Sequence, residues 1–305
     1  MASTASLLTL RDGRTLSYTS YGAPSTTNPS TIFYFHGFPG SRLEGAFWGP
    51  FAASLSARLI CTDRPGCGLS SLQSKRRILD WPSDVLELAD HLNISRFFVM
   101  GISGGSPYVL ACVKEIPRER LLGAAVVSGI YPLKLGTAGM TWRSRVLMYV
   151  APWATRLVAP LLDWQVGRLV RDPDPRVLEE WVTKDISRLP EQDRKCVENK
   201  FVEDEQFRKQ MIESLRESLR PGSQGAAQEW RLFVSDWGFE LEEVQFDGLA
   251  LWHGRLDVNC PCRMPEKAVK QMKGAKLKLF EEEAHLSLPI NHAEEILKHL
   301  LETCK

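Results

Sequence analysis

The segment that most constrains the fold contains the pattern Gly-Ile-Ser-Gly-Gly, with the serine at position 103. Phe97–Met100, before it, has the apolar composition of a buried strand, and Tyr108–Lys114, after it, has helical spacing. A strand that passes into a helix within so few residues has to turn sharply. Glycines two residues before and two after Ser103 remove Cβ atoms that would collide with neighbouring elements. We therefore predict a strand, a tight turn and a helix, with the Ser103 hydroxyl accessible to a base and a substrate.

Charge and hydropathy narrow the class of protein. The 305 residues include 44% hydrophobic and 25% charged side chains, which is typical of a globular protein. A formal net charge of +1 argues against nucleic-acid binding, which needs concentrated basic surface. No apolar run reaches the roughly 18 residues that suggest a membrane span. Met1–Ser6 lacks the basic and apolar pattern of a secretory signal, so we predict a cytoplasmic protein without a membrane span.

The cysteines favour reduced thiols. There are seven of them, scattered over a chain large enough to build its own core. Cys260-Pro-Cys262 resembles part of a metal site, but no Cys or His pair stands at zinc spacing elsewhere. We therefore expect neither a metal ion nor another cofactor.

The chain alternates β-rich runs with helical segments, and this order predicts an α/β fold. Arg11-Asp12-Gly13-Arg14 is a strong hairpin signal that joins the first two runs. Later strands separated by helices imply parallel βαβ units with helices on both faces of the sheet. The eight predicted strands are Leu7–Leu10, Thr15–Thr19, Thr31–Phe35, Arg58–Thr62, Phe97–Met100, Gly123–Val127, Leu249–His253 and Lys276–Phe280. The predicted helices cover 43–56, 78–92, the stretch after Ser103, 261–272 and 289–303.

A long gap interrupts this alternation, and it exceeds the length of a structureless loop. Its first part is rich in tryptophan, and its second part is charged and helix-forming with prolines as punctuation. We predict a helical cap over residues 132–246, inserted into a core domain of residues 1–131 and 247–305. Tryptophans in a cap can pack on the core, contact a membrane surface or line a pocket. We expect Trp142, Trp153 and Trp164 to contribute to substrate binding.

A serine hydroxyl needs a base to act as a nucleophile, and His285 is the strongest of six histidines. It follows the last predicted strand, at the sheet edge where ligands gather. His36 and His253 each precede a glycine at a strand end, which suggests a structural role. The other three, His91, His292 and His299, are expected to be surface or helix-capping residues.

The base in turn needs a carboxylate that fixes its tautomer. Asp257 lies just past the strand Leu249–His253, whereas the loop after Gly123–Val127 offers no carboxylate. A helix N-cap is the alternative role for Asp257. Asp247 and the run Glu281–Glu283 are weaker candidates for the acid.

A developing oxyanion needs preorganised N–H donors. Gly104 N–H follows the serine at a helix start, where free N–H groups favour an anion. The second donor is expected in the loop after Thr31–Phe35. Because Pro39 has no N–H, Phe38 is the better candidate and Gly40 the fallback. For Arg42, in the same loop, we expect an ion pair with Glu44 or another nearby acid.

These motifs closely resemble those of the α/β-hydrolase superfamily. The resemblance covers nearly everything outside the cap and rests on His36–Gly40, Asp63–Ser70, Gly101–Gly105, Asp257 and His285, in the order nucleophile, acid, base. It implies a mostly parallel eight-stranded sheet with a cap over the active site. Epoxide hydrolases and haloalkane dehalogenases are poor matches within it, because their nucleophile is an aspartate.

Two further points follow from the resemblance. Relatives often carry glycine before the histidine, where this chain has Ala284. Asp63 matches an acid that shapes a loop in the family and takes no part in the triad.

The sequence thus predicts a serine hydrolase that cleaves an ester, lactone, thioester or related acyl bond of a hydrophobic small molecule. Two alternatives remain open at this point. One is an aminopeptidase of the proline-releasing kind, which would need cap carboxylates near the substrate amine. The other is a non-hydrolytic protein of the same fold, either a small-molecule receptor or a lyase or cyclase.

Overall fold

The computed structural model describes residues 5–27, 29–140, 145–146, 148–149 and 155–303. Eight strands of the described chain form one sheet in the order β1-β2-β4-β3-β5-β6-β7-β8. The strands are β1 (Ser6–Thr9), β2 (Thr15–Gly22), β3 (Ser30–Phe35), β4 (Ala57–Thr62), β5 (Phe97–Ile102), β6 (Leu121–Val127), β7 (Leu249–Gly254) and β8 (Lys276–Phe280).

The sheet is parallel except at one edge. β1 and β2 form the hairpin predicted from Asp12-Gly13, and β2 pairs antiparallel with β4. From β4 to β8 all neighbouring strands run parallel. The carboxyl ends of these six strands therefore meet at one edge of the sheet, as predicted for an α/β fold.

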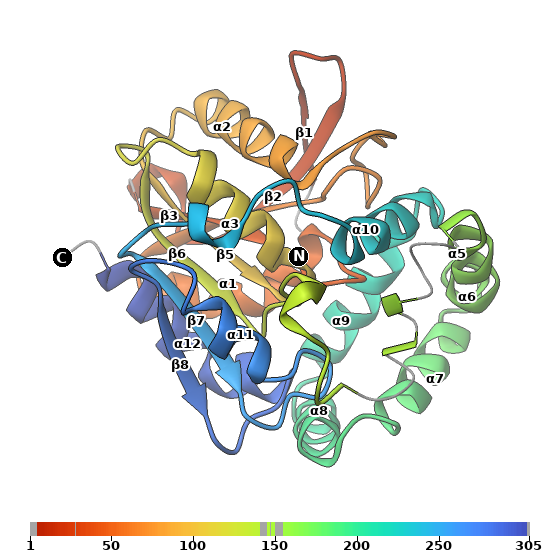
Figure 1. Cartoon of the computed structure of the whole chain (residues 1–305). Helices are drawn as coiled ribbons and strands as arrows, with labels where there is room; N and C mark the ends of the chain where they lie inside the picture. Colours follow the sequence, from red (N-terminus) through yellow and green to blue (C-terminus); the bar gives the residue numbers. More distant parts are fainter. Residues whose placement is uncertain (1–4, 28, 141–144, 147, 150–154, 304–305) are drawn as a thin grey trace.

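Helices cover both faces of the sheet (Figure 1). One face packs against α2 (Trp81–His91), α3 (Ser106–Glu115) and α11 (Arg263–Ala268). The other packs against α1 (Gly45–Ser54) and α12 (Ser287–Glu302). Strand residues alternate between the two cores, since successive side chains of a strand point to opposite faces. The predicted helix over 261–272 is shorter in the structure, and the others agree within a few residues.

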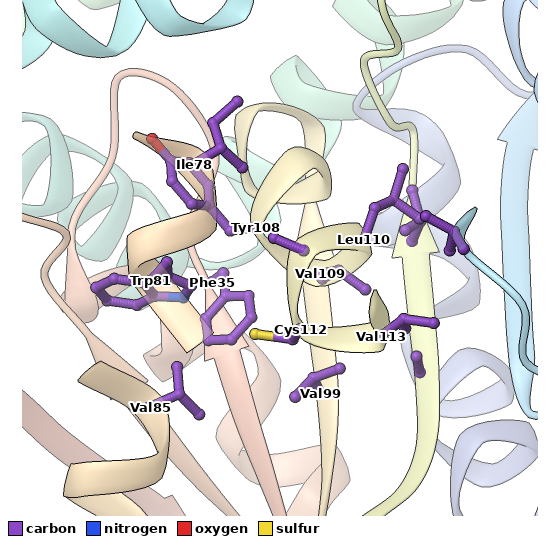
Figure 2. Close-up of a cluster of buried hydrophobic side chains, with 14 of the residues drawn as sticks. Phe35, Ile78, Trp81, Val85, Val99, Tyr108, Val109, Leu110, Cys112 and Val113 are labelled. Atoms are coloured by element: carbon purple, nitrogen blue, oxygen red, sulfur yellow. The ribbon is translucent and has the colours of Figure 1, made fainter. Parts of the chain in front are cut away.

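The core beneath α2 and α3 illustrates why these segments fold as they do. Figure 2 shows Trp81 and Val85 of α2 and Tyr108, Val109 and Cys112 of α3 in one cluster with Phe35 of β3. All six are at most 2% exposed. Phe35 of β3 stacks edge-to-face on Trp81, with ring centroids 5.5 Å apart. This packing fixes where α3 begins, and therefore where the turn at Ser103 lies.

The segment between β6 and β7, here called the insertion (residues 132–246), is helical in its described part. Figure 1 shows its green to cyan helices gathered on one side of the sheet. They are α5 (Thr155–Leu162), a π-helical turn at Asp163–Gly167, α6 (Arg168–Val170), α7 (Pro175–Ile186), α8 (Glu191–Glu203), α9 (Glu205–Ser218) and α10 (Gln224–Val234). The division into a core domain and a cap stays a prediction. Of the helices described, none has the length and apolar character to cross a bilayer.

The packing on both faces of the sheet predicts at which positions an alanine substitution lowers the free energy of unfolding. Ile296 of α12 is fully buried, whereas Leu7 of β1 is 59% exposed. Ile296→Ala is expected to lower the free energy of unfolding by about 2–5 kcal/mol, because it leaves a cavity against the sheet. Leu7→Ala is the control, with an expected change within about 0.5 kcal/mol. Urea unfolding measures both, and similar losses for the two variants would contradict the assigned packing of α12.

Candidate active site

The sequence-predicted nucleophile, base and acid come together at the carboxyl edge of the sheet. Ser103 follows β5, Asp257 follows β7 and His285 follows β8. These positions lie far apart in the chain, but their strands belong to the parallel part of one sheet. Parallel topology places the loops that follow such strands side by side.

The backbone makes a tight and strained turn at Ser103, as the flanking glycines predict. Ser103 has φ of +48°, in the left-handed region that non-glycine residues rarely occupy. A Cβ at Gly101 would lie 2.8 Å from the Gly105 carbonyl oxygen, and a Cβ at Gly105 would lie 2.3 Å from the Phe35 carbonyl oxygen. Only glycine fits both positions. The close approach of α3 to β3 and β5 therefore forces the turn that presents the Ser103 hydroxyl.

His285 bridges the serine and the aspartate. Its Nε2 lies 3.0 Å from Ser103 Oγ, and its Nδ1 lies 2.8 Å from Asp257 Oδ2. Asp257 is 3% exposed and His285 is 7% exposed, whereas Ser103 is partly exposed. This arrangement can carry a proton from the hydroxyl to Nε2, with Nδ1 held as the donor to the carboxylate.

The second oxygen of Asp257 is also fixed. Asp257 Oδ1 accepts hydrogen bonds from the backbone N–H groups of Asn259 and Cys260, both at 2.8 Å. Burial works to raise the pKa of Asp257, but the His285 imidazole and these donors outweigh it and hold the pKa below its ordinary value. The carboxylate is thus ionised at neutral pH. Asp257 does not cap α11, whose N-cap residue is Cys262.

His253 lies beside this carboxylate in the structural role predicted from the sequence. Its Nε2 is 3.4 Å from Asp257 Oδ2 and 2.5 Å from the Cys260 carbonyl oxygen. Burial lowers the pKa of His253, more than the Asp257 charge raises it, so the ring is neutral and Nε2–H donates. The ring therefore secures the loop that carries Asp257.

The backbone of His285 is held from two sides by residues that sequence reasoning did not identify. Asp193 of α8, 1% exposed, accepts the N–H groups of His285 (3.2 Å), Leu286 (2.8 Å) and Ser287 (2.9 Å). These are free donors at the start of α12. Ser128, after β6, donates its hydroxyl to the His285 carbonyl oxygen at 2.9 Å. No local pattern marks Asp193, because the contact spans 92 residues.

Electrostatics keep the His285 ring basic. Burial works against the protonated ring, but the charge and hydrogen bond of Asp257 outweigh it, and the charge of Asp193 adds to them. The pKa of His285 is consequently raised above its ordinary value of 6.5.

Phe38 lies directly against Gly104. A Cβ at Gly104 would lie 2.7 Å from Phe38 Cβ and 3.0 Å from the Phe233 ring, so this position accepts only glycine. Among the described residues, no hydrogen-bond partner occupies the Phe38 N–H. The residues that carry the two predicted oxyanion donors, Phe38 and Gly104, therefore lie side by side. Their role stays a prediction.

Arg42 forms ion pairs, as expected, but not with Glu44. Arg42 is buried and pairs with Asp63 at 2.5 Å and with Glu217 of α9 at 2.6 Å. Glu44 accepts the Gly37 N–H at 3.1 Å and the Tyr34 hydroxyl instead. Arg42 thus satisfies two acids and leaves no free charge for a substrate anion. Asp63 also accepts the Ser17 hydroxyl at 2.5 Å and so organises the loop after β4.

One group of described residues has the composition of a metal site, and it overlaps the triad. Ligand atoms of Asp257, Cys260 and His285 lie within 4.8 Å of one another. Burial raises the pKa of the Cys260 thiol well above its ordinary value, so the thiol is protonated and a poor ligand. Asp257 and His285 already share a hydrogen bond. The group therefore suits proton transfer better than metal binding.

Of the three tryptophans predicted to contact substrate, the structure describes Trp164. Trp142 and Trp153 lie outside the described residues. Trp164 is 63% exposed, and the Arg168 guanidinium lies 5.2 Å from the centre of its ring. Contact of these side chains with a substrate stays a prediction.

Comparison with known proteins identifies the family. The profile of the alpha/beta hydrolase family matches residues 32–298, which include the core strands from β4 to β8 and the insertion. A probable proline iminopeptidase of Leptolyngbya boryana is 34% identical over 123 residues, or 39% of this chain. The match spans only 36% of that relative's length.

Solved structures share the whole fold at low identity. An esterase (EaEST) from Exiguobacterium antarcticum superposes with a TM-score of 0.64 at 15% identity, covering 98% of this chain and 100% of the esterase. The enol-lactonase from Burkholderia xenovorans LB400 gives 0.65 at 17% identity, covering 98% of this chain and 99% of the lactonase. At such identities the likeness establishes the fold alone.

The buried contacts of His285 predict how its titration responds to substitution. Asp193→Asn removes a negative charge beside the ring while it keeps one oxygen for the backbone donors. We expect the pKa of His285, measured by NMR titration of the imidazole, to fall toward 6.5. Glu191→Gln is the matched control on the same helix, because Glu191 is exposed and pairs with Lys195. Equal effects of the two substitutions would contradict the role assigned to Asp193.

Proposed function

Because the chain belongs to the alpha/beta hydrolase family, we propose that it is a serine hydrolase that cleaves an acyl bond through an acyl-enzyme. The observation that carries this proposal is the bridge formed by His285 between Ser103 Oγ and Asp257 Oδ2. Each of these groups has the hydrogen-bond partner that acyl transfer requires of it.

The first half of the proposed reaction forms the acyl-enzyme. Ser103 Oγ attacks the substrate carbonyl carbon while His285 Nε2 takes the hydroxyl proton. Asp257 keeps Nδ1 protonated and stabilises the imidazolium. The carbonyl oxygen becomes negative, and the N–H groups of Phe38 and Gly104 stabilise it. When the tetrahedral intermediate collapses, Nε2 returns the proton to the leaving oxygen, sulfur or nitrogen.

Water completes the cycle along the same route. His285 Nε2 removes a proton from water as its oxygen attacks the acyl carbon, and the same two N–H groups stabilise the second oxyanion. Collapse then returns the proton to Ser103 Oγ and releases the carboxylic acid. No metal or redox step is required, since every proton passes through one imidazole.

The residues around the nucleophile support an apolar substrate. Phe38 packs against Trp230 and Phe233 of α10, with ring centroids 5.7 Å and 5.4 Å apart. Phe38 also packs, together with Leu286 and Ile290, against a second apolar cluster, formed by buried residues of the insertion. We therefore propose a hydrophobic ester, lactone or thioester as substrate. The likeness of the fold to an esterase and an enol-lactonase agrees with this class.

The partial match to a probable proline iminopeptidase raises a second candidate, an aminopeptidase. Such an enzyme needs a carboxylate to bind the substrate amine, and the insertion would supply it. Two described acids of the insertion are buried, and both are already engaged. Glu229 pairs with Arg64 and Arg76, and Asp193 accepts three backbone N–H groups. Neither buried acid is therefore free to bind a substrate amine, which favours ester cleavage over aminopeptidase activity.

Ser103→Ala is expected to lower the hydrolysis rate by roughly 10⁴-fold or more, because the members of a triad act as a unit. The assay is a panel of p-nitrophenyl acyl esters of varied chain length, together with lactones and peptide amides. A fluorophosphonate probe is expected to label the wild type and not the variant. Ligand-induced thermal stabilisation without turnover or labelling would refute the hydrolase and favour a receptor.

The raised pKa of His285 predicts the pH profile. The base must be neutral to accept the Ser103 proton, so kcat/KM rises with pH through the pKa of His285 and levels off above it. Since that pKa is raised, the midpoint of the acid limb is expected above pH 6.5. Below it the rate should fall about tenfold per pH unit. A midpoint clearly below 6.5 would contradict the assignment of His285 as the base.

A further inference from the structure

The direction of the Phe38 N–H is set by the peptide unit to which it belongs. A trans peptide is planar, and its C=O and N–H point in opposite directions. The Gly37 carbonyl and the Phe38 N–H belong to the same unit. Whatever holds Gly37 O therefore also decides where the Phe38 N–H points.

Two buried donors hold this carbonyl. Arg64 Nη2 lies 3.0 Å from Gly37 O, and His36 Nδ1 lies 2.8 Å from it. Arg64 Nη1 donates to the preceding carbonyl, His36 O, at 2.6 Å. Both side chains are fully buried. One guanidinium thus fixes two successive peptide units of the loop after β3.

The tautomer of His36 fits this arrangement. The Arg64 backbone N–H approaches His36 Nε2 at 3.4 Å, so Nε2 accepts and Nδ1 carries the proton that is donated to Gly37 O. Burial and the Arg64 charge lower the pKa of His36 to about 3. The ring is therefore neutral, and its donor is present, over the working pH range of most enzymes.

A carboxylate of the insertion fixes the guanidinium. Glu229 of α10 accepts Arg64 Nε at one oxygen and Arg64 Nη2 at the other, the latter at 3.0 Å. Arg76 Nη2 lies 3.0 Å from Glu229 Oε1, and the Tyr108 hydroxyl donates to the same oxygen at 3.1 Å. Burial opposes the charge of Glu229, but the two arginines lower its pKa to about 2. Glu229 stays ionised and holds Arg64 in one orientation.

Of the polar groups in the two peptide units, one is left free. Arg64 and His36 occupy both carbonyls, and Glu44 accepts the Gly37 N–H at 3.1 Å. The Phe38 N–H has no partner among the described residues, and the Phe38 Cβ lies against Gly104. The loop is thus organised so that this donor is available for a ligand.

We propose that Arg64 and His36, with Arg64 anchored by Glu229 of the insertion, are positioning residues that aim the Phe38 N–H at the substrate oxyanion. This inference rests on the proposed function, because it takes the Phe38 N–H as an oxyanion donor. It adds that the donor is correctly oriented only while α10 is docked on the core. The insertion therefore takes part in building the catalytic site.

Arg64→Lys tests the guanidinium. Lysine keeps a positive charge beside Glu229, but a single ammonium cannot hold both carbonyls and the carboxylate in the same geometry. We expect kcat for ester hydrolysis to fall about 10- to 100-fold with little change in KM, since losing one oxyanion donor altogether costs about 10²–10³ in kcat. Arg14→Lys is the matched control, because Arg14 makes a similar two-point contact with Asp84 away from this loop. Equal kcat in both variants and wild type would overturn the proposal.

Substitution of His36 is a second test. Because the His36 ring is neutral, replacing it leaves no buried charge without a partner. Asparagine can place an N–H donor near the position of Nδ1, and leucine cannot. His36→Leu is expected to lower kcat by about tenfold or more, and His36→Asn to restore most of it. Thermal unfolding of both variants measures stability separately. A loss of kcat that follows the melting temperature, with no rescue by asparagine, would indicate a purely structural role and overturn the proposal.

A crystal structure of Arg64→Lys separates this inference from the proposed function. We expect the Gly37–Phe38 peptide plane to rotate away from its wild-type orientation. An unchanged plane would overturn the positioning role even if kcat fell. Should the wild type hydrolyse none of the acyl substrates, the proposed function fails, and this structure still decides whether Arg64 orients the peptide.

Discussion

The close approach of α3 to β3 is the constraint on which the site depends. Carbonyl oxygens of β3 and of the turn stand where Cβ atoms of Gly105 and Gly101 would lie. Ser103 can complete so tight a turn only with a left-handed backbone, which raises its hydroxyl above the edge of the sheet. The apolar contacts of α2 and α3 beneath the turn maintain the strain (Figure 2). The packing of α2 and α3 in the core thus determines where the Ser103 hydroxyl oxygen lies.

Three carboxylates of the insertion then hold three separate loops of the core. Asp193 binds the backbone at His285, Glu217 binds Arg42, and Glu229 binds Arg64. These loops follow β8, β3 and β4, so each contact crosses from the insertion to the same edge of the sheet. The helices of the insertion, gathered on one side of the sheet in Figure 1, are therefore linked to the site by polar contacts. The insertion and the loops are expected to order together.

Burial gives these contacts a high desolvation cost, and it also fixes the orientation of the groups that form them. A buried ion pair is costly to desolvate, and removing one partner of such a pair destabilises a protein by about 3–5 kcal/mol. Arg64, Arg76 and Glu229 form a group in which two cations share one carboxylate, while the neighbouring His36 is neutral. In the same way, the charges of Asp257 and His285 oppose the effect of burial, so that Asp257 stays ionised and His285 stays basic. Charge balance thus supports both halves of the proposed chemistry, proton transfer and stabilisation of the oxyanion.

By itself, the sequence determined the α/β fold, the eight strands and the helical insertion, because each of these features has a local or periodic pattern of residues. It also determined that Ser103, Asp257 and His285 meet. Glycine spacing marks the turn, and strand order brings the loops together. The tertiary structure alone decided which residues support them. It showed that Arg42 pairs with Asp63 and Glu217 and not with Glu44, and it revealed the contacts of Asp193 and Glu229. Such contacts join residues up to 175 positions apart and have no periodicity, so only the packing of the insertion on the core determines them.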